Sequence, residues 1–177
     1  MPNPHASGTA YSVLTTMVQL FGDDGGFGYL KKLDANINGY TRNGGAPAVA
    51  AARGETLIAI TYMHDAVTQI VGGFPIKIVA PCEGTGYAIG AMSLVKGGPN
   101  PGPARQWYEF AMTAEAQEIG LKLQRYEYPS NMKAKVPSET PDMRNFKVIE
   151  YDFKRFGGSE ERKRLLTRWD TEVTSRR

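Results

Sequence analysis

The sequence feature that most constrains the fold is a continuous apolar run over residues 57–62. It reads Leu-Ile-Ala-Ile-Thr-Tyr and lacks the polar alternation of a strand with one wet face. Such a run is typical of a strand in a sheet that is covered on both faces. A helical pattern follows at 65–71, and shorter strand patterns occur at 76–80 and 87–95. Because helical and strand patterns alternate, we expect an α/β fold with helical layers on a sheet.

Apolar residues at helical spacing, together with nearby Gly, Pro and Ser residues, predict the remaining elements. Gly22 is expected to end the first helix, Thr113 to divide a longer helix, and Ser159 to cap the last one. The Arg and Lys side chains of the last helix are expected to form a solvated face, and a Pro-rich loop is expected at 126–140. Further helices are expected at 13–21, 27–33, 46–53 and 104–123, and from Ser159 onward with Leu165, Leu166, Trp169 and Val173 on the buried face.

Length and composition exclude several classes of protein. A chain of 177 residues, 41% of them hydrophobic, can form one ordinary domain or two small lobes. Its net charge of +3 is too small to indicate a nucleic-acid partner without a clustered basic patch. Cys82 is the single cysteine, so an internal disulfide is excluded. No apolar run approaches the roughly 20 residues that cross a bilayer, and no signal-peptide pattern follows Met1.

The start of the first helix is one candidate site. Ser7, Gly8 and Thr9 lie directly before the apolar helical pattern. The first amides of a helix have no partner within it, and the helix dipole adds positive potential at that end. Small and hydroxylic residues there favour a bound anion. An ordinary capped helix start is the alternative interpretation.

A second candidate site follows the apolar run, where Tyr62, His64 and Asp65 connect a predicted strand to the next helix. Ligands of open α/β sheets collect at the carboxyl ends of the strands. A phenol, an imidazole and a carboxylate there could hydrogen-bond a hydroxyl-rich ligand or coordinate a metal, whereas Asp65 could instead simply cap the helix. Glu83 precedes a Gly-Thr-Gly sequence, which permits close approach of the backbone to a ligand but is more typical of a turn. The sequence lacks the spacing of a nucleotide-binding loop.

Catalytic and metal-binding patterns are weak in this chain. Ser7 lacks the Gly-x-Ser-x-Gly surroundings of a hydrolase nucleophile, and no spacing indicates a Cys82–His64 pair. Only two His residues and one Cys are present, without the paired spacing of a metal site. We therefore predict that the protein is not an enzyme and carries no resident cofactor or metal.

Seven ordered motifs cover nearly all of the chain. They are Asn3-Pro4-x-x-Ser7-Gly8-Thr9-x-Tyr11, Tyr29-Leu30-x-x-Leu33-Asp34, Ala50-x-x-Arg53-Gly54-Glu55, His64-Asp65-Ala66, Glu83-Gly84-Thr85-Gly86-Tyr87, Ala114-x-Ala116-Gln117 and the tail from Tyr151-Asp152 to Trp169. Together they resemble the extracellular solute-binding proteins of ABC importers, in the branch labelled iron(III)-binding. That branch also includes binders of hexose phosphates and phosphonates.

The resemblance implies the type II periplasmic-binding-protein fold, an α/β fold whose two lobes close on a ligand by a hinge motion. This chain would be an incomplete version, with the second lobe and the C-terminal part of the first lobe, because family members carry a signal peptide and most of the first lobe before the first motif. Residues 1–82 would be a second-lobe segment truncated at its N-terminus. Residues 83–125 would be the return crossing and a first-lobe segment, and residues 126–177 a crossing loop and a C-terminal helical segment.

The resemblance also implies a ligand. Iron binders of the family present adjacent tyrosines, whereas Tyr62 is followed here by Met63. Fe(III) prefers anionic oxygen ligands, so a phosphorylated sugar or a phosphonate is favoured. Iron(III) as a transported ligand, held by Tyr62, His64 and Asp65, is the alternative. The implied ligand-binding residues are Ser7, Gly8, Thr9, His64, Asp65 and Glu83.

The implied partners are a small anionic solute and, in the intact family, an ABC permease. The implied location of the intact family is the periplasm. No nucleic-acid partner is expected. Loss of most of the first lobe would weaken solute binding and expose lobe surface, so self-association is a further expectation. A truncated product that binds no solute and associates with itself is the alternative function.

Overall fold

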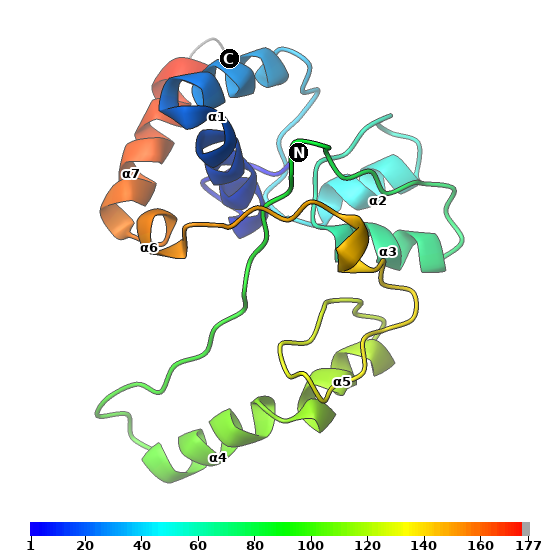
Figure 1. The fold of residues 1–177 in the computed structure, drawn as a ribbon, viewed down its shortest axis with the longest axis vertical. Helices are drawn as coiled ribbons and strands as arrows, with labels where there is room; N and C mark the ends of the chain where they lie inside the picture. Colours follow the sequence, from blue (N-terminus) through cyan, green and yellow to red (C-terminus); the bar gives the residue numbers. More distant parts are fainter. Residues whose placement is uncertain (175–177) are drawn as a thin grey trace. The chain divides into compact units, whose positions relative to one another are not determined.

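The computed structural model describes residues 1–174, which divide into two units (Figure 1). One unit joins Met1–Tyr87 to the chain from Asp142 onward, and the other is Ala88–Pro141. The first unit therefore brings the two ends of the sequence together around one core. The division into 1–82, 83–125 and 126–177 follows the expected lobes of the family and stays a prediction.

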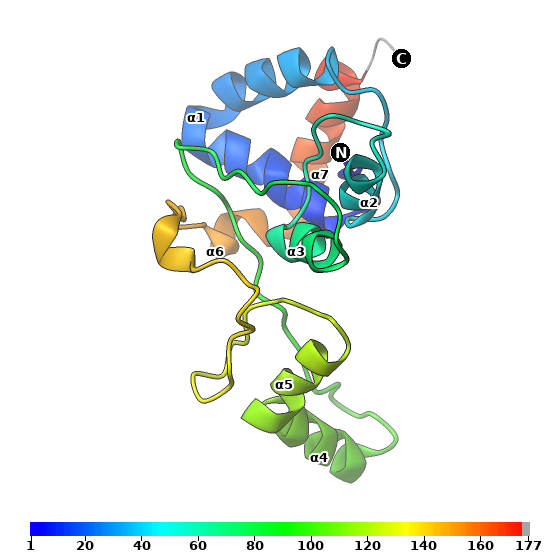
Figure 2. The same cartoon turned by 90° about the vertical axis from the view of Figure 1, so that its right-hand side faces the viewer.

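Helix α1 (Gly8–Asp34) organises the first unit, and it bends sharply at Gly22 (Figure 2). Gly22 has a φ of 72° and a ψ of 171°, a left-handed conformation that glycine adopts without a Cβ clash. The predicted end of the first helix and start of the second are thus found as a kink within one element. Gly26 keeps the two halves close, because a Cβ there would lie 2.8 Å from the Cα of Val18.

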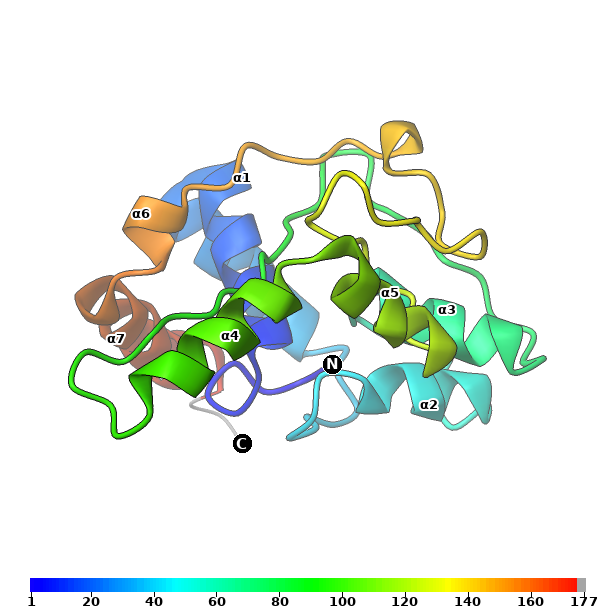
Figure 3. The same ribbon diagram turned by 90° about the horizontal axis from the view of Figure 1, so that it is seen from below.

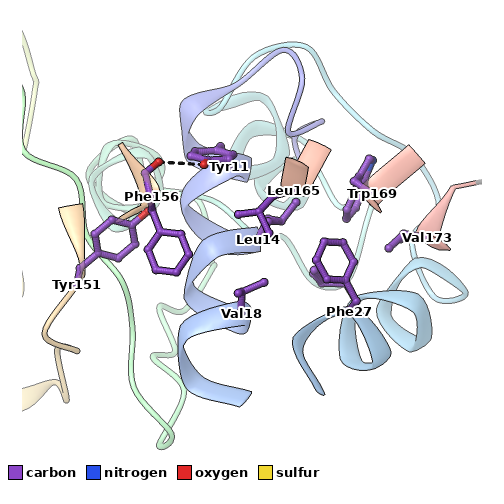
Figure 4. Packing of buried hydrophobic residues seen from close by; sticks show 10 residues of the cluster. Tyr11, Leu14, Val18, Phe27, Tyr151, Phe156, Leu165, Trp169 and Val173 are labelled. Carbon is purple, nitrogen blue, oxygen red and sulfur yellow. Dashed lines mark hydrogen bonds between the residues drawn. The ribbon is translucent and has the colours of Figure 1, made fainter. Parts of the chain in front are cut away.

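The core of this unit lies between the two halves of α1 and the C-terminal helices α6 (Phe153–Phe156) and α7 (Ser159–Arg168) (Figure 4). The Tyr11 hydroxyl donates a 2.9 Å hydrogen bond to the carbonyl of Phe156, and burial raises the pKa of Tyr11 to about 12. The buried side chains are Tyr11, Leu14, Val18, Phe27, Leu30, Tyr151, Phe156, Leu165, Trp169 and Val173.

The last helix confirms the predicted buried face and corrects its cap. The residue that caps α7 is Gly158, and Ser159 is the first helical residue. A π-helical turn (Trp169–Val173) continues the helix and buries Trp169 and Val173. Leu165 is buried, and Leu166 packs against the core from a half-buried position.

Lys163 and Arg164 on the basic face of α7 are exposed, as its sequence predicts, and ion pairs also connect this face to the bend of α1. Asp23 lies 2.8 Å from the guanidinium of Arg155 and 2.6 Å from that of Arg164. Glu161 pairs with both arginines, at 2.9 and 2.7 Å. Arg168 reaches Asp24 at 3.0 Å. The charged residues just after the kink are therefore held by the C-terminal helices.

Helices α2 (Ala46–Ala52) and α3 (Met63–Val71) pack side by side in the same unit (Figure 3). Pro47 lies in the first turn of α2, as its fixed φ favours. Small side chains along α2, which are all Ala apart from one Pro and one Val, permit this close packing. Both predicted helices are confirmed, and α3 begins two residues earlier than expected.

The predicted strands at 57–62, 76–80 and 87–95 are not found, so the sheet expected from the sequence is wrong for the part of the chain described. The pairing of described residues is limited to two isolated parallel bridges, Pro2 with Thr41 and Thr85 with Val148. A strand needs a neighbouring strand to satisfy its N–H and C=O groups. These segments have the composition of strands but no neighbour among the described residues.

The second unit contains α4 (Pro101–Ala111) and α5 (Ala114–Lys122), which divide at Thr113 as predicted. The Thr113 hydroxyl caps α5 by accepting a 3.2 Å hydrogen bond from the amide of Ala116. The loop expected at 126–140 has no helix and packs on α5 through Asn131, whose amide donates to Gln117 Oε1 at 2.9 Å. A short 3-10 turn (Met143–Asn145) then leads back to the first unit.

None of the described helices combines the length and apolar character required to span a bilayer.

Candidate functional site

The start of α1 presents two hydroxyls and a set of helix-terminal amides. The first helical hydrogen bond runs from the amide of Tyr11 to the carbonyl of Ser7 at 3.1 Å, so the amides of Gly8, Thr9 and Ala10 precede it. Ser7 has extended dihedral angles (φ −138°, ψ 128°), and its side chain does not cap the helix. The chain therefore reaches the helix start without using the Ser7 hydroxyl for a local bond.

The hydroxyls of Ser7 and Thr9 have no hydrogen-bond partner among the described residues, although both residues are largely buried. Within the same residues, no side-chain oxygen that is sealed from solvent lacks a partner. The two oxygens are thus reachable from outside the protein. Space above Gly8 is open as well, since a Cβ there would meet nothing within 4 Å. The helix start is therefore accessible to a small molecule.

The Gly44-Gly45 turn lies against this helix start. A Cβ on Gly44 would overlap the hydroxyl oxygen of Thr9 and would lie 3.2 Å from that of Ser7. A Cβ on Gly45 would lie 2.7 Å from Oδ1 of Asp65. Two glycines at this point allow the backbone to pass between the α1 hydroxyls and the Asp65 carboxylate. Only the close contacts, and not the residue types, reveal that role.

Asp65 lies in the first turn of α3 and is held by the segment before it. The Thr61 hydroxyl lies 3.1 Å from Asp65 Oδ2 and 2.8 Å from the carbonyl oxygen of Gly44. His64 Nε2 lies 3.8 Å from Asp65 Oδ1, and the two side chains keep 28% and 19% of their surface exposed. A carboxylate that is partly exposed beside an imidazole can accept hydrogen bonds from a ligand hydroxyl.

Tyr62 joins α3 to α1 and does not point away as an independent ligand group. Its hydroxyl forms a 2.9 Å hydrogen bond with the hydroxyl of Ser12, which lies one turn along α1 from Gly8 and Thr9. Its ring packs at a tilt against the His64 imidazole, with centroids 5.5 Å apart. Tyr62 therefore fixes the start of α3 next to the start of α1. No group of three or more His, Cys, Asp or Glu side chains within the described residues has the arrangement of a metal site.

Glu83 is a predicted site residue that no contact among the described residues connects to the others. It is exposed, and its carboxylate accepts a 3.4 Å hydrogen bond from the Cys82 thiol. A hydrogen bond from its own backbone amide, with a smaller contribution from the thiol, lowers the pKa of Glu83. Cys82 thus contacts Glu83, and no described contact pairs it with His64.

The Gly-Thr-Gly sequence after Glu83 serves packing. Gly84 has a φ of 129° and is buried, and a Cβ there would lie 2.7 Å from Cγ2 of Ile149. A Cβ on Gly86 would overlap the Thr16 hydroxyl on α1. The amide of Thr85 donates to the Lys147 carbonyl at 2.8 Å. This geometry favours the turn interpretation for the loop.

The arrangement therefore brings together Ser7, Gly8, Thr9, His64 and Asp65, to which it adds Gly44, Gly45 and Thr61. It offers amides and hydroxyls at the positive end of the first half of α1, which runs from Gly8 to the kink at Gly22. An imidazole and a carboxylate lie on the other side of the glycine turn. Such a set can hold an anionic group at one end and hydroxyl groups at the other.

Comparisons with known proteins identify the family of this chain. The profile of the family described as bacterial extracellular solute-binding protein matches residues 1–155. An uncharacterised protein of Haemophilus influenzae (strain ATCC 51907 / DSM 11121 / KW20 / Rd) is 37% identical over 172 residues, which are 97% of this chain and 50% of that protein.

Two solved structures share the fold of this chain. The periplasmic binding protein AfuA from Actinobacillus pleuropneumoniae, with exogenous fructose-6-phosphate bound, has 40% sequence identity and a TM-score of 0.94. The periplasmic binding protein P5PA has 33% identity and a TM-score of 0.89. The matches cover 98% and 97% of this chain but 55% of each solved chain. The chain thus spans about half the length of its relatives.

Proposed function

This chain belongs to the family of bacterial extracellular solute-binding proteins, and from that premise we propose that it binds a small anionic solute as the substrate-binding component of an ABC importer. A phosphorylated sugar or a phosphonate is the favoured solute, and the periplasm is the proposed location. The descriptions of both solved relatives as periplasmic binding proteins support this, as does the fructose-6-phosphate bound to AfuA.

The observation that carries the proposal is that the hydroxyls of Ser7 and Thr9 at the start of α1 are reachable from solvent and have no hydrogen-bond partner among the described residues. Amides and hydroxyls at a helix start bind phosphate oxygens without needing a cationic side chain. Asp65, which lies across the Gly44-Gly45 turn, is placed to accept hydrogen bonds from sugar hydroxyls. A solute with phosphate at one end and hydroxyls at the other fits both parts.

Iron(III) remains the alternative solute. The Tyr62 hydroxyl, the single phenol among the proposed iron ligands, is already hydrogen-bonded to Ser12 at 2.9 Å. The donor set therefore provides less anionic oxygen than a ferric ion prefers. Self-association and a product that binds no solute stay predictions, since no separate observation favours either.

The test is a set of ligand titrations in which backbone-amide NMR measures binding. Fructose 6-phosphate, inorganic phosphate and an iron(III) chelate are added separately to the protein and to its Thr9→Val and Asp65→Asn variants. Removing one hydroxyl that donates to a phosphate is expected to weaken phosphate and sugar phosphate alike, by about tenfold. Asp65→Asn is expected to weaken the sugar phosphate more than inorganic phosphate, because only the sugar offers ring hydroxyls.

Thr171→Val and Asp24→Asn serve as matched controls, since both residues are exposed and their side chains bond to Thr167 and Arg168 of α7. Both are expected to bind as the unaltered protein does. Saturation by iron(III) with no response to phosphate compounds would replace the proposal by the iron alternative. Equal binding of fructose 6-phosphate by Thr9→Val and the unaltered chain would show that the start of α1 is not the site.

A further inference from the structure

A groove separate from the candidate solute site lies between the N-terminal turn and the last helix. Its volume is about 370 Å³, which is in the range of small-molecule sites. The residues that line this α7 groove are His5, Ser159, Arg162, Lys163, Leu166, Thr167 and Asp170. Those from Ser159 onward are spaced three and four apart, or one apart at a corner, so they lie on one helical face. The lining shares no residue with the site at the start of α1.

Two cations of the α7 groove differ from the other basic residues of the C-terminal helices. Arg155, Arg164 and Arg168 each form an ion pair with an aspartate or a glutamate. Arg162 and Lys163 have no carboxylate partner among the described residues. The acidic side chains near α7 therefore neutralise three of these cations and leave the two that line the groove.

Arg162 is held in a defined orientation. Its guanidinium carbon lies 4.3 Å from the centroid of the Tyr11 ring, over the face of that ring. Tyr11 is 7% exposed, and its hydroxyl is bonded to the carbonyl of Phe156, so the ring is fixed in the core. A guanidinium that stacks through its flat face keeps the N–H groups of its edge free for the oxygens of an anion. Arg162 therefore binds an anion without first having to be ordered.

The other polar groups of the α7 groove leave its charge positive. His5 Nε2 lies 2.8 Å from Oδ1 of Asp170, so the carboxylate in the lining already has an imidazole partner. The Thr167 hydroxyl donates to the Lys163 carbonyl at 2.9 Å. The hydroxyl of Ser159 has no partner within the described part of the chain. Two cations and a hydroxyl donor thus face one carboxylate.

We propose that the α7 groove is a second binding site, specific for a small anion that carries phosphate or carboxylate oxygens. Arg162 donates from the edge of its guanidinium, Lys163 supplies a second positive charge and Ser159 a hydroxyl. Both phosphate and carboxylate match the planar fork of an arginine. The proposal does not depend on which solute occupies the start of α1.

The test is a residue-resolved NMR titration of the 177-residue chain, with inorganic phosphate and with citrate in separate experiments. Ionic strength is kept constant, so that general screening of surface charge is the same in every sample. The amides of Arg162, Lys163 and Thr167 are expected to shift and to saturate with at least one of the two anions. The anion that binds more tightly identifies the class of ligand.

Lys163→Gln and Arg162→Gln are each expected to weaken this binding by about tenfold, because each removes a charged donor. Asp170→Asn is expected to strengthen it by about two- to threefold, because it removes the negative charge from the lining. Lys154→Gln is the matched control, since Lys154 is exposed and lies outside the lining. Lys163 is exposed as well, so its variant tests the groove without disturbing the core.

Thr9→Val separates the α7 groove from the start of α1. The amides of the groove are expected to respond to the anion equally in this variant and in the unaltered chain. A groove response that disappears in Thr9→Val would show that it only follows binding at α1, and would overturn the proposal. So would the absence of a saturable response to both anions, or equal affinities for Lys163→Gln and Lys154→Gln.

Discussion

Gly44 and Gly45 show how single residues determine the candidate site. Their missing side chains let the turn pass between the hydroxyls of Ser7 and Thr9 and the carboxylate of Asp65. The sequence predicts a turn at this point because of the Gly pair, but it contains no signal for what the turn touches. The helix start and His64-Asp65 were predictable from local pattern, whereas the glycine pair that separates them was not.

We predict that Gly44→Ala destabilises the protein by about 1–3 kcal/mol, because the new Cβ would overlap the Thr9 hydroxyl and force the turn away from α1. Urea denaturation followed by circular dichroism measures the change. Gly39→Ala is the matched control, because a Cβ there meets nothing within 4 Å. Its expected effect is below about 0.5 kcal/mol. Equal stability of the two variants would mean that the turn moves freely.

At the scale of elements, the bend of α1 and the basic face of α7 stabilise each other. The sequence predicts the end of a helix at Gly22 and a charged last helix, since both depend on local pattern. It does not predict that Asp23 meets Arg155 and Arg164, because those contacts join positions more than 130 residues apart. A charged helical face whose exposure the sequence predicts is therefore also connected to α1 by ion pairs.

These ion pairs predict a loss of stability in acid. Burial alone would raise the pKa of Asp23, but hydrogen bonds from Arg164 and Arg155 outweigh it, so the pKa is lower in the folded protein than in the unfolded chain. The pKa of Glu161 is lowered as well, chiefly by the hydrogen bond from Arg164. Burial of Glu161 opposes this shift, and the hydrogen bond from Arg155 adds to it. Their contribution is complete above the unfolded values, near pH 4, and is lost as pH falls through the folded values.

Asp23→Asn is accordingly expected to lower stability at pH 7 by on the order of 1 kcal/mol, since these partly exposed pairs are screened by solvent. The stability of the variant should also fall less than that of the unaltered protein between pH 5 and about pH 2. Thermal melts over that pH range provide the measurement. Asp24→Asn is the control, because Asp24 is almost fully exposed and its pairing among the described residues is limited to Arg168. A pH profile that Asp23→Asn leaves unchanged would contradict the prediction.

At the scale of the whole molecule, one core unites the two ends of the sequence. Trp169 is 1% exposed and meets the Tyr40 ring edge-on, with centroids 5.6 Å apart. Trp107, the other tryptophan, is 63% exposed and lies in the separate Ala88–Pro141 unit. The two tryptophans therefore form a natural pair for testing where stability resides.

Trp169→Ala is expected to destabilise the first unit by about 3–5 kcal/mol, because it removes the largest fully buried side chain of the core. Trp107→Ala is expected to cost less than about 1 kcal/mol. Guanidinium denaturation followed by circular dichroism measures both, and the remaining tryptophan in each variant reports on its own unit by fluorescence. Similar losses for the two variants would show that the core does not depend on Trp169.

The sequence by itself determined most of the longer helices, a break in the helical pattern at Gly22, the apolar face of the last helix and the family motifs, because each depends on residues close together in the chain. Only the tertiary structure decided that the glycine turn separates the hydroxyls from Asp65, that the basic helix is pinned by Asp23, and that the apolar run at 57–62 stays outside a sheet. A helix satisfies its own backbone, whereas a strand depends on a neighbour. Local pattern therefore predicted the helices correctly and the strands wrongly.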